Sequence, residues 1–122
     1  MTSVLVVDDN YRNRKLALDV LGAAGFRTFG SATAAQGIAL AREHGPDVIL
    51  MDLRLPDMDG ADATRRLGAD ERTALIPVVA MSASPLEGRE DWLEEAGFAG
   101  WLDKPIHVST FPEQVRRYCA AS

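Results

Sequence analysis

Residues 48–60 read VILMDLRLPDMDG, and this stretch places an acidic residue directly after an apolar run. The run Val48–Met51 is short and continuous, as is typical of a strand that is buried on both faces of a parallel sheet. Asp52 stands where such a strand would leave the core. Because partial desolvation disfavours an isolated carboxylate, we expect another part of the chain to compensate its charge or to use it.

Two further runs, Val4–Val7 and Val78–Met81, have the same apolar character and predict central strands. Arg27–Ser31 and Gly100–Leu102 are weaker strand candidates, and we expect them at or near the edges of the sheet. Helical stretches alternate with these runs. The pattern predicts an α/β fold, a (βα)5 unit in which an open parallel five-stranded sheet carries helices on both faces.

The clearest helical stretches are Tyr11–Ala24, Thr33–Glu43 and Val108–Cys119, and the acidic segment Glu87–Ala96 predicts a further helix. The last stretch has an apolar stripe that should face the core, made of Val108, Phe111, Val115 and Tyr118. Glycines stand where the helices should end, at positions 25, 45 and 97. No linker or repeat interrupts the series, so we expect one domain over residues 1–122.

Composition excludes several classes of function. The 122 residues carry a net charge of −5 without a basic stripe, which argues against a nucleic-acid surface. Val4–Val7 is too short for a signal or membrane segment, so we expect a cytoplasmic protein with no membrane contact. Cys119 is the only cysteine, which excludes an internal disulfide, and we expect it to pack with the last helix.

Chemically useful side chains follow four of the predicted strands. They are Asp8 and Asp9, Asp52, Ser82, and Lys104. Because the carboxyl ends of parallel strands meet at one edge of the sheet, these groups should converge. Carboxylates alone would repel one another, whereas a Mg²⁺ ion together with the lysine would neutralise them. A metal, an ammonium and a hydroxyl form a clamp for a phosphoryl group, with Asp52 as the nucleophile that accepts it.

The loop Asp57–Gly60 also has acidic residues at alternate positions. It lacks the later glutamate of a calcium-binding loop. We therefore expect a turn here, with Gly60 at positive φ.

The chain resembles a response-regulator receiver domain. The motifs that carry the resemblance are VLVVDDN (residues 4–10), DVILMDLRLPDMDG (47–60), IPVVAMSA (76–83) and WLDKPI (101–106). The resemblance implies a flavodoxin-like, CheY-like fold and Mg²⁺-dependent phosphorylation of Asp52 from a phosphohistidine donor. The metal ligands that it implies are Asp8, Asp9, Asp52 and the backbone carbonyl of Arg54.

The resemblance also implies roles in switching. Ser82 would bind the phosphoryl group, Lys104 would pair with it, and the Lys104–Pro105 peptide bond would be cis. The switch aromatic, usually Tyr or Phe, is here Trp101, and the switch hydroxyl is Ser82 instead of the more frequent Thr. Because Ser82 leaves more room than Thr, we expect Ser82 and Trp101 to be matched in volume.

The same resemblance implies the partners. We expect a histidine kinase or a histidine phosphotransfer protein as donor, and a downstream protein that binds the surface formed by the helix within Glu87–Ala96, the strand Gly100–Leu102 and the helix Val108–Cys119. We expect a monomer or a weak dimer, and no enzymatic activity beyond phosphoryl transfer to Asp52 and its dephosphorylation.

The sequence leaves three alternative functions open. A flavodoxin-like cofactor carrier would need Ser, Thr or Gly where Asp8 and Asp9 stand. A Mg²⁺-dependent phosphatase with an aspartyl nucleophile would need an acid two positions after Asp52, where the chain has Arg54. The third is a receiver domain of a hybrid histidine kinase or a larger regulator, which DDNYRNRKLALDVL (residues 8–21) resembles.

Overall fold

The computed structural model describes residues 2–83 and 90–119. Strands and helices alternate along the chain in the order β1 (Ser3–Val7), α1 (Tyr11–Ala23), β2 (Arg27–Ser31), α2 (Ala34–His44), β3 (Val48–Asp52), α3 (Gly60–Gly68), β4 (Val78–Ser82), α4 (Glu90–Ala96), β5 (Gly100–Asp103) and α5 (Phe111–Tyr118). The segment Glu87–Arg89 of the predicted fourth helix lies outside the described residues.

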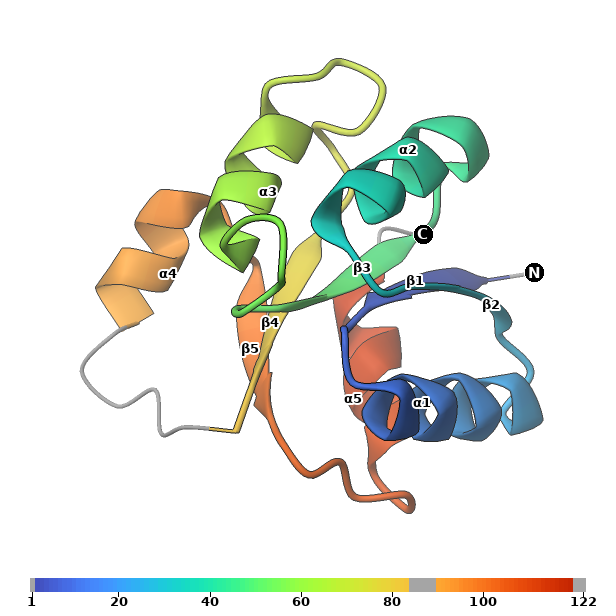
Figure 1. Ribbon diagram of the computed structural model, residues 1–122. Coiled ribbons are helices and arrows are strands. Elements are labelled where there is room, and N and C mark those ends of the chain that lie inside the picture. The colour runs from blue at the N-terminus through green and yellow to red at the C-terminus, as the bar shows by residue number, and fades with distance from the viewer. Residues whose placement is uncertain (1, 84–89, 120–122) are drawn as a thin grey trace.

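The strands form one parallel sheet in the order β2-β1-β3-β4-β5, which confirms the predicted open parallel sheet of five strands (Figure 1). The three continuous apolar runs are the central strands, and the two weaker candidates, β2 and β5, are the edges. Three strands end on the polar residues of interest, Asp52, Ser82 and Asp103, one residue beyond the apolar runs.

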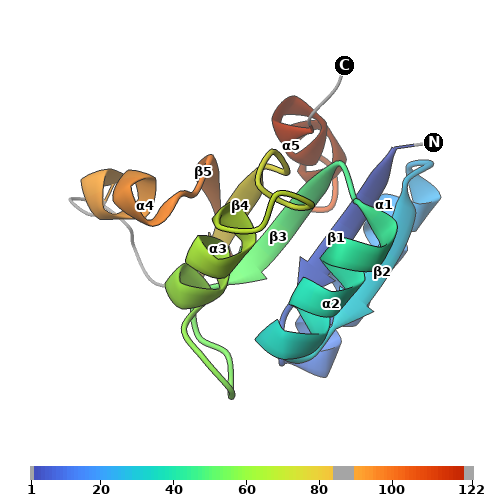
Figure 2. The same cartoon turned by 90° about the horizontal axis from the view of Figure 1, so that it is seen from above.

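Helices cover both faces of the sheet. Helices α2, α3 and α4 lie on one face and α1 and α5 on the other (Figure 2). Successive side chains of each central strand alternate between the two layers. In β1, for example, Leu5 and Val7 pack with the first group of helices, and Val4 and Val6 pack with the second. Burial on both faces explains why these strands are continuously apolar.

The helix ends follow from local chemistry. The side chain of Asn10 accepts a hydrogen bond from the N–H of Asn13 at the start of α1, and Thr33 accepts one from Gln36 at the start of α2. Glycines 25, 45 and 97 adopt positive φ after α1, α2 and α4, as expected for residues that end helices. None of the helices in the described part of the chain is long and apolar enough to span a membrane.

Gly60 corrects one prediction, because its φ is not positive. It is the first residue of α3, and a Cβ atom here would lie against the backbone oxygen of Asp52. The position therefore needs glycine for close packing on the strand that carries Asp52, and not for its backbone conformation.

The last helix is shorter than predicted. Residues 108–110 form a turn, in which the N–H groups of Thr110 and Phe111 donate to the carbonyl of His107. Val108 is 58% exposed and does not join the core, whereas Phe111 and Val115 are buried as expected. Cys119 follows the helix and packs against the layer formed by α1 and α5.

Candidate functional site

A cleft of about 500 Å³ lies at the carboxyl edge of the sheet. It is lined by every residue to which the sequence analysis assigned chemistry there, namely Asp8, Asp9, Asp52, Arg54, Ser82 and Lys104. These residues come from the ends of β1, β3, β4 and β5, so the sheet brings together groups that are up to 96 positions apart in the chain. The convergence agrees with the prediction that residues directly after parallel strands meet at one edge of the sheet.

Lys104 connects two of the carboxylates. Its Nζ lies 2.8 Å from Oδ2 of Asp8 and 3.1 Å from Oδ2 of Asp52, and the side chains of all three residues are largely buried. The backbone N–H of Lys104 donates to the carbonyl of Ser82, which anchors the residue at the end of β4. The peptide bond between Lys104 and Pro105 is cis, as predicted.

The site retains more negative charge than the lysine can offset. Burial raises the pKa of Asp52 above its ordinary value, and the charge of Asp8 acts in the same direction. The N–H of Arg54 and the ammonium of Lys104 oppose this shift without cancelling it. For Lys104, burial favours the neutral form, but the two carboxylates outweigh burial and raise its pKa. A further cation in the cleft would relieve the excess of negative charge.

The carboxylates of Asp8, Asp9 and Asp52 could bind such a cation together. One oxygen from each lies within 4.8 Å of the others. Three hard oxygen ligands in a half-buried cleft suit Mg²⁺, which keeps several waters and binds through few carboxylates. The donor set therefore fits the predicted ion.

Asp8 is held by α1 as well as by Lys104. Its Oδ1 accepts a hydrogen bond of 2.9 Å from the N–H of Asn10, and its backbone carbonyl accepts one of 2.7 Å from Nη1 of Arg14. The sequence pattern does not single out Arg14, because a guanidinium on a helix is by default a solvated charge. The arginine orients the turn between β1 and α1 that carries two of the carboxylates.

The loop after Asp52 is tied at several points. Oδ1 of Asp52 accepts from the N–H of Arg54, the N–H of Gly60 donates to the carbonyl of Leu53, and Arg54 forms an isolated bridge with Asp59. The side chain of Asp57 accepts hydrogen bonds from the N–H groups of Ala34 and Ala35 at the start of α2. Hydrogen bonds therefore hold the loop together and link it to the start of α2.

The two tryptophans differ in position. Trp92, in α4, lines the cleft and is 38% exposed. The sequence pattern left the position of Trp92 open. The helix that follows β4 begins near the carboxyl edge of a parallel sheet, and this rule could have placed Trp92 near the cleft. Trp101 is half-buried in β5 and packs against the layer formed by α2, α3 and α4, outside the cleft lining.

Comparisons with known proteins agree with this site. The response regulator receiver domain family matches residues 4–116. The polar-differentiation response regulator DivK of Brucella ovis is 39% identical over 116 residues, which cover 95% of this chain and 94% of that protein.

Solved structures extend the comparison. The receiver domain of the sensor histidine kinase PA1611 from Pseudomonas aeruginosa, solved with a magnesium ion in its active site cleft, is 31% identical with a TM-score of 0.87 and 98% coverage of both chains. The chemotaxis protein CheY4 of Vibrio cholerae has a TM-score of 0.91 at 24% identity, covers 97% of this chain and 98% of its own, and supports the fold alone. The chain therefore belongs to the response regulator receiver family and acts in two-component phosphorelay signalling.

Proposed function

We propose that Asp52 is the phosphoryl acceptor. An oxygen of its carboxylate would attack the phosphorus of a phosphohistidine, so that a P–O bond forms while the P–N bond breaks and the electron pair returns to the imidazole. The position of Asp52 supports this proposal. It is the last residue of a central strand and lines the cleft, and its Oδ2 lies 3.1 Å from Nζ of Lys104.

The remaining groups have complementary roles in this proposal. Asp8 and Asp9 would hold Mg²⁺ together with Asp52 and the backbone carbonyl of Arg54, all of which line the cleft. The bound ion would neutralise charge on the transferred group. Lys104 would move its ammonium from Asp52 toward the phosphoryl oxygens, and the hydroxyl of Ser82 would donate to one of them.

The proposed reactions take place only on Asp52 of this chain. We propose no reaction beyond phosphorylation of Asp52 and its hydrolysis, in which water attacks the phosphorus and releases phosphate while the carboxylate is restored. Relatives include a response regulator and the receiver domain of a sensor histidine kinase, and the proposed chemistry is the same in either setting. The cytoplasmic location and the state as a monomer or weak dimer stay predictions.

The proposed donor is a histidine kinase or a histidine phosphotransfer protein. The proposed output is a change in the surface of α4, β5 and α5, which a downstream protein would bind. Trp101 on β5 and Ser82 on β4 belong to strands that pair with each other, so a movement at the cleft has a short route to this surface. A phosphoryl group would shift the balance between two arrangements of these elements.

The convergence of three carboxylates and one lysine carries the proposal, and intact-mass spectrometry tests it. Incubation with acetyl phosphate and Mg²⁺ should add one acid-labile phosphoryl group to the protein. The Asp52→Asn variant should remain unmodified. Asp103→Asn, which removes an exposed carboxylate at the same edge of the sheet, should be modified like the original protein. Equal modification of the Asp52→Asn variant would show that the acceptor is a different residue.

A further inference from the structure

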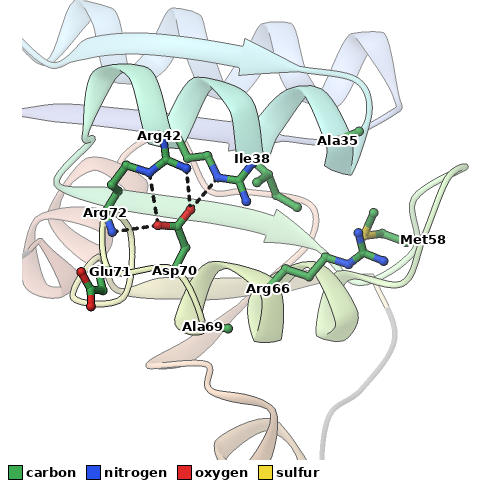
Figure 3. A pocket seen from close by; sticks show the side chains of 9 residues that line it. All are labelled: Ala35, Ile38, Arg42, Met58, Arg66, Ala69, Asp70, Glu71 and Arg72. Atoms are coloured by element: carbon green, nitrogen blue, oxygen red, sulfur yellow. Dashed lines mark hydrogen bonds and ion pairs between the residues drawn. The ribbon is translucent and has the colours of Figure 1, made fainter.

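A second hollow lies between α2 and α3 and is lined by none of the residues that line the cleft. Its volume is about 940 Å³, within the range of ligand sites in proteins. We name it the arginine groove after its lining, in which Arg42, Arg66 and Arg72 accompany the apolar side chains of Ile38 and Met58 (Figure 3).

The charge of the groove opposes that of the whole protein. The three arginines face only two acidic residues, Asp70 and Glu71, whereas the chain as a whole carries a net charge of −5. The groove is therefore a positively charged region on an acidic protein, and it would attract a partner segment that carries carboxylates.

Asp70 organises one end of the groove. Its carboxylate accepts from Nε of Arg42 at 2.7 Å and from Nε and Nη2 of Arg72 at 3.3 and 3.1 Å. These contacts hold the pKa of Asp70 well below its ordinary value, so it stays ionised and keeps both guanidiniums in place. Each guanidinium has five N–H donors, and those not used by Asp70 remain available to a ligand.

Arg66 supplies a cation at the other end. Its side chain extends toward Met58 and away from Asp70, with Ile38 between the two ends (Figure 3). Among the residues that the structure describes, none forms an ion pair or a hydrogen bond with the Arg66 side chain. The groove thus presents a guanidinium at each end and an apolar surface in the middle.

This pattern selects the class of ligand. A single phosphate could use one end but not the apolar middle. No aromatic side chain occurs among the described residues that line the groove, so a nucleobase would lack a stacking partner. A peptide with an apolar residue between two acidic residues matches both ends and the middle at once.

The groove is also connected to the β3–α3 loop. Asp57 accepts hydrogen bonds of 2.9 Å from the N–H groups of Ala34 and Ala35 at the start of α2, and the next residue, Met58, forms part of the groove. A ligand in the groove would therefore contact Met58, which belongs to the loop that follows Asp52. We propose that the arginine groove is a docking site for an acidic segment of a partner protein, in which an apolar side chain lies between two carboxylates.

A titration of the ¹⁵N-labelled full chain followed by NMR tests this proposal. The probe is a capped peptide Gly-Glu-Leu-Glu-Gly, added to about 5 mM, which would occupy about 80% of a site with a dissociation constant of about 1 mM. We expect saturable shifts of amide signals that are confined to α2, Met58 and the segment from Arg66 to Arg72. The absence of saturable shifts, or shifts centred on another surface, would overturn the proposal.

Two variant proteins and two further probes complete the test. Arg66→Gln should weaken peptide binding about tenfold or more, as expected for the loss of a charge-assisted contact, while its spectrum shows that the fold is intact. Arg117→Gln removes an exposed arginine from α5 and should leave binding unchanged. The peptide Gly-Gln-Leu-Gln-Gly should not bind. Equal binding by Arg66→Gln or by the glutamine peptide would refute the role of charge, and inorganic phosphate that saturates the same signals more tightly than the peptide would identify an oxyanion site instead.

Discussion

Nζ of Lys104 lies 3.1 Å from Oδ2 of Asp52, although β4 separates β3, which ends at Asp52, from β5, which Lys104 follows. The same ammonium lies 2.8 Å from Oδ2 of Asp8. One cation therefore joins the ends of three strands at the carboxyl edge of the sheet. The contact neutralises part of the acidic cluster, and it also makes the stability of this edge depend on a single side chain.

Replacing Lys104 with Met should destabilise the protein. The change leaves two largely buried carboxylates without their shared cation, and such uncompensated charge costs about 2–3 kcal/mol. Urea unfolding at pH 7 without Mg²⁺ measures the loss. In an Asp52→Asn background the same Lys104→Met change should cost less stability, because one of the two carboxylates that would lose the cation is already removed. A Lys104→Met protein as stable as the original would contradict the stabilising role of this contact.

Asp52→Asn should stabilise the protein at neutral pH in Mg²⁺-free buffer. The pKa of Asp52 is raised in the folded state, so its ionised form costs stability at any pH above that raised value. The cost diminishes as the pH falls through the folded pKa and vanishes below the ordinary value of 3.8, where both states are protonated. Urea unfolding from pH 7 to pH 3 should show the gain of the variant shrinking. A constant difference over this range would be inconsistent with the shift.

Asp9→Ala should weaken Mg²⁺ binding about tenfold or more, because a protein Mg²⁺ site relies on few carboxylates. Asp9 is exposed beside Asp8 and Asp52 and is one of the three possible ligands. Isothermal titration calorimetry gives the affinity. Asp19→Ala, which changes the net charge equally on the exposed face of α1, is the matched control and should bind like the original protein. Unchanged affinity in Asp9→Ala would remove Asp9 from the ligand set.

Asp57→Ala should lower the melting temperature by a few degrees, because two N–H groups at the start of α2 lose their acceptor. These N–H groups hold the pKa of Asp57 below 3.8, so its contribution to stability is complete above that pH and is lost as the pH falls through the lowered pKa. Asp57→Asn keeps one acceptor oxygen, so its melting temperature should lie between those of the original protein and Asp57→Ala. Calorimetric scans at pH 7 and below pH 3 provide the comparison, and equal melting temperatures at pH 7 would argue against the cap.

Trp101 should turn inward when a phosphoryl mimic binds. The serine at position 82 leaves room for the larger indole, and Trp101 is only half-buried in the structure. Because Trp92 lines the cleft, the measurement uses a Trp92→Phe background. Addition of beryllofluoride with Mg²⁺ should shift the remaining fluorescence to shorter wavelength and reduce acrylamide quenching. If binding is confirmed and neither signal changes, Trp101 is a packing residue that does not move.

Much of this molecule could be predicted from local patterns. Burial on both faces makes the central strands continuously apolar, and this allowed Val48–Met51 and its equivalents to be recognised without any knowledge of their neighbours. Parallel strands with helical crossovers have few topologies, and their carboxyl ends meet at one edge. The cluster of Asp8, Asp9, Asp52 and Lys104 follows from these rules together with the position of each residue after its strand.

Other features depend on contacts between distant segments, which no local pattern encodes. The sequence pattern predicts a turn glycine at position 60. The structure shows a different reason for glycine, because the backbone of Asp52 packs against this position and leaves no room for a Cβ atom. Val108 fits the apolar stripe of α5, yet a turn closed by the carbonyl of His107 leaves it in solvent. Arg42 and Asp70 are 28 residues apart and become partners only because α2 packs beside α3. The sequence by itself determined the alternation of strands and helices and the chemistry at the strand ends, because burial leaves a local pattern in each segment. The tertiary structure alone decided which side chains meet, because their distances depend on how the helices pack.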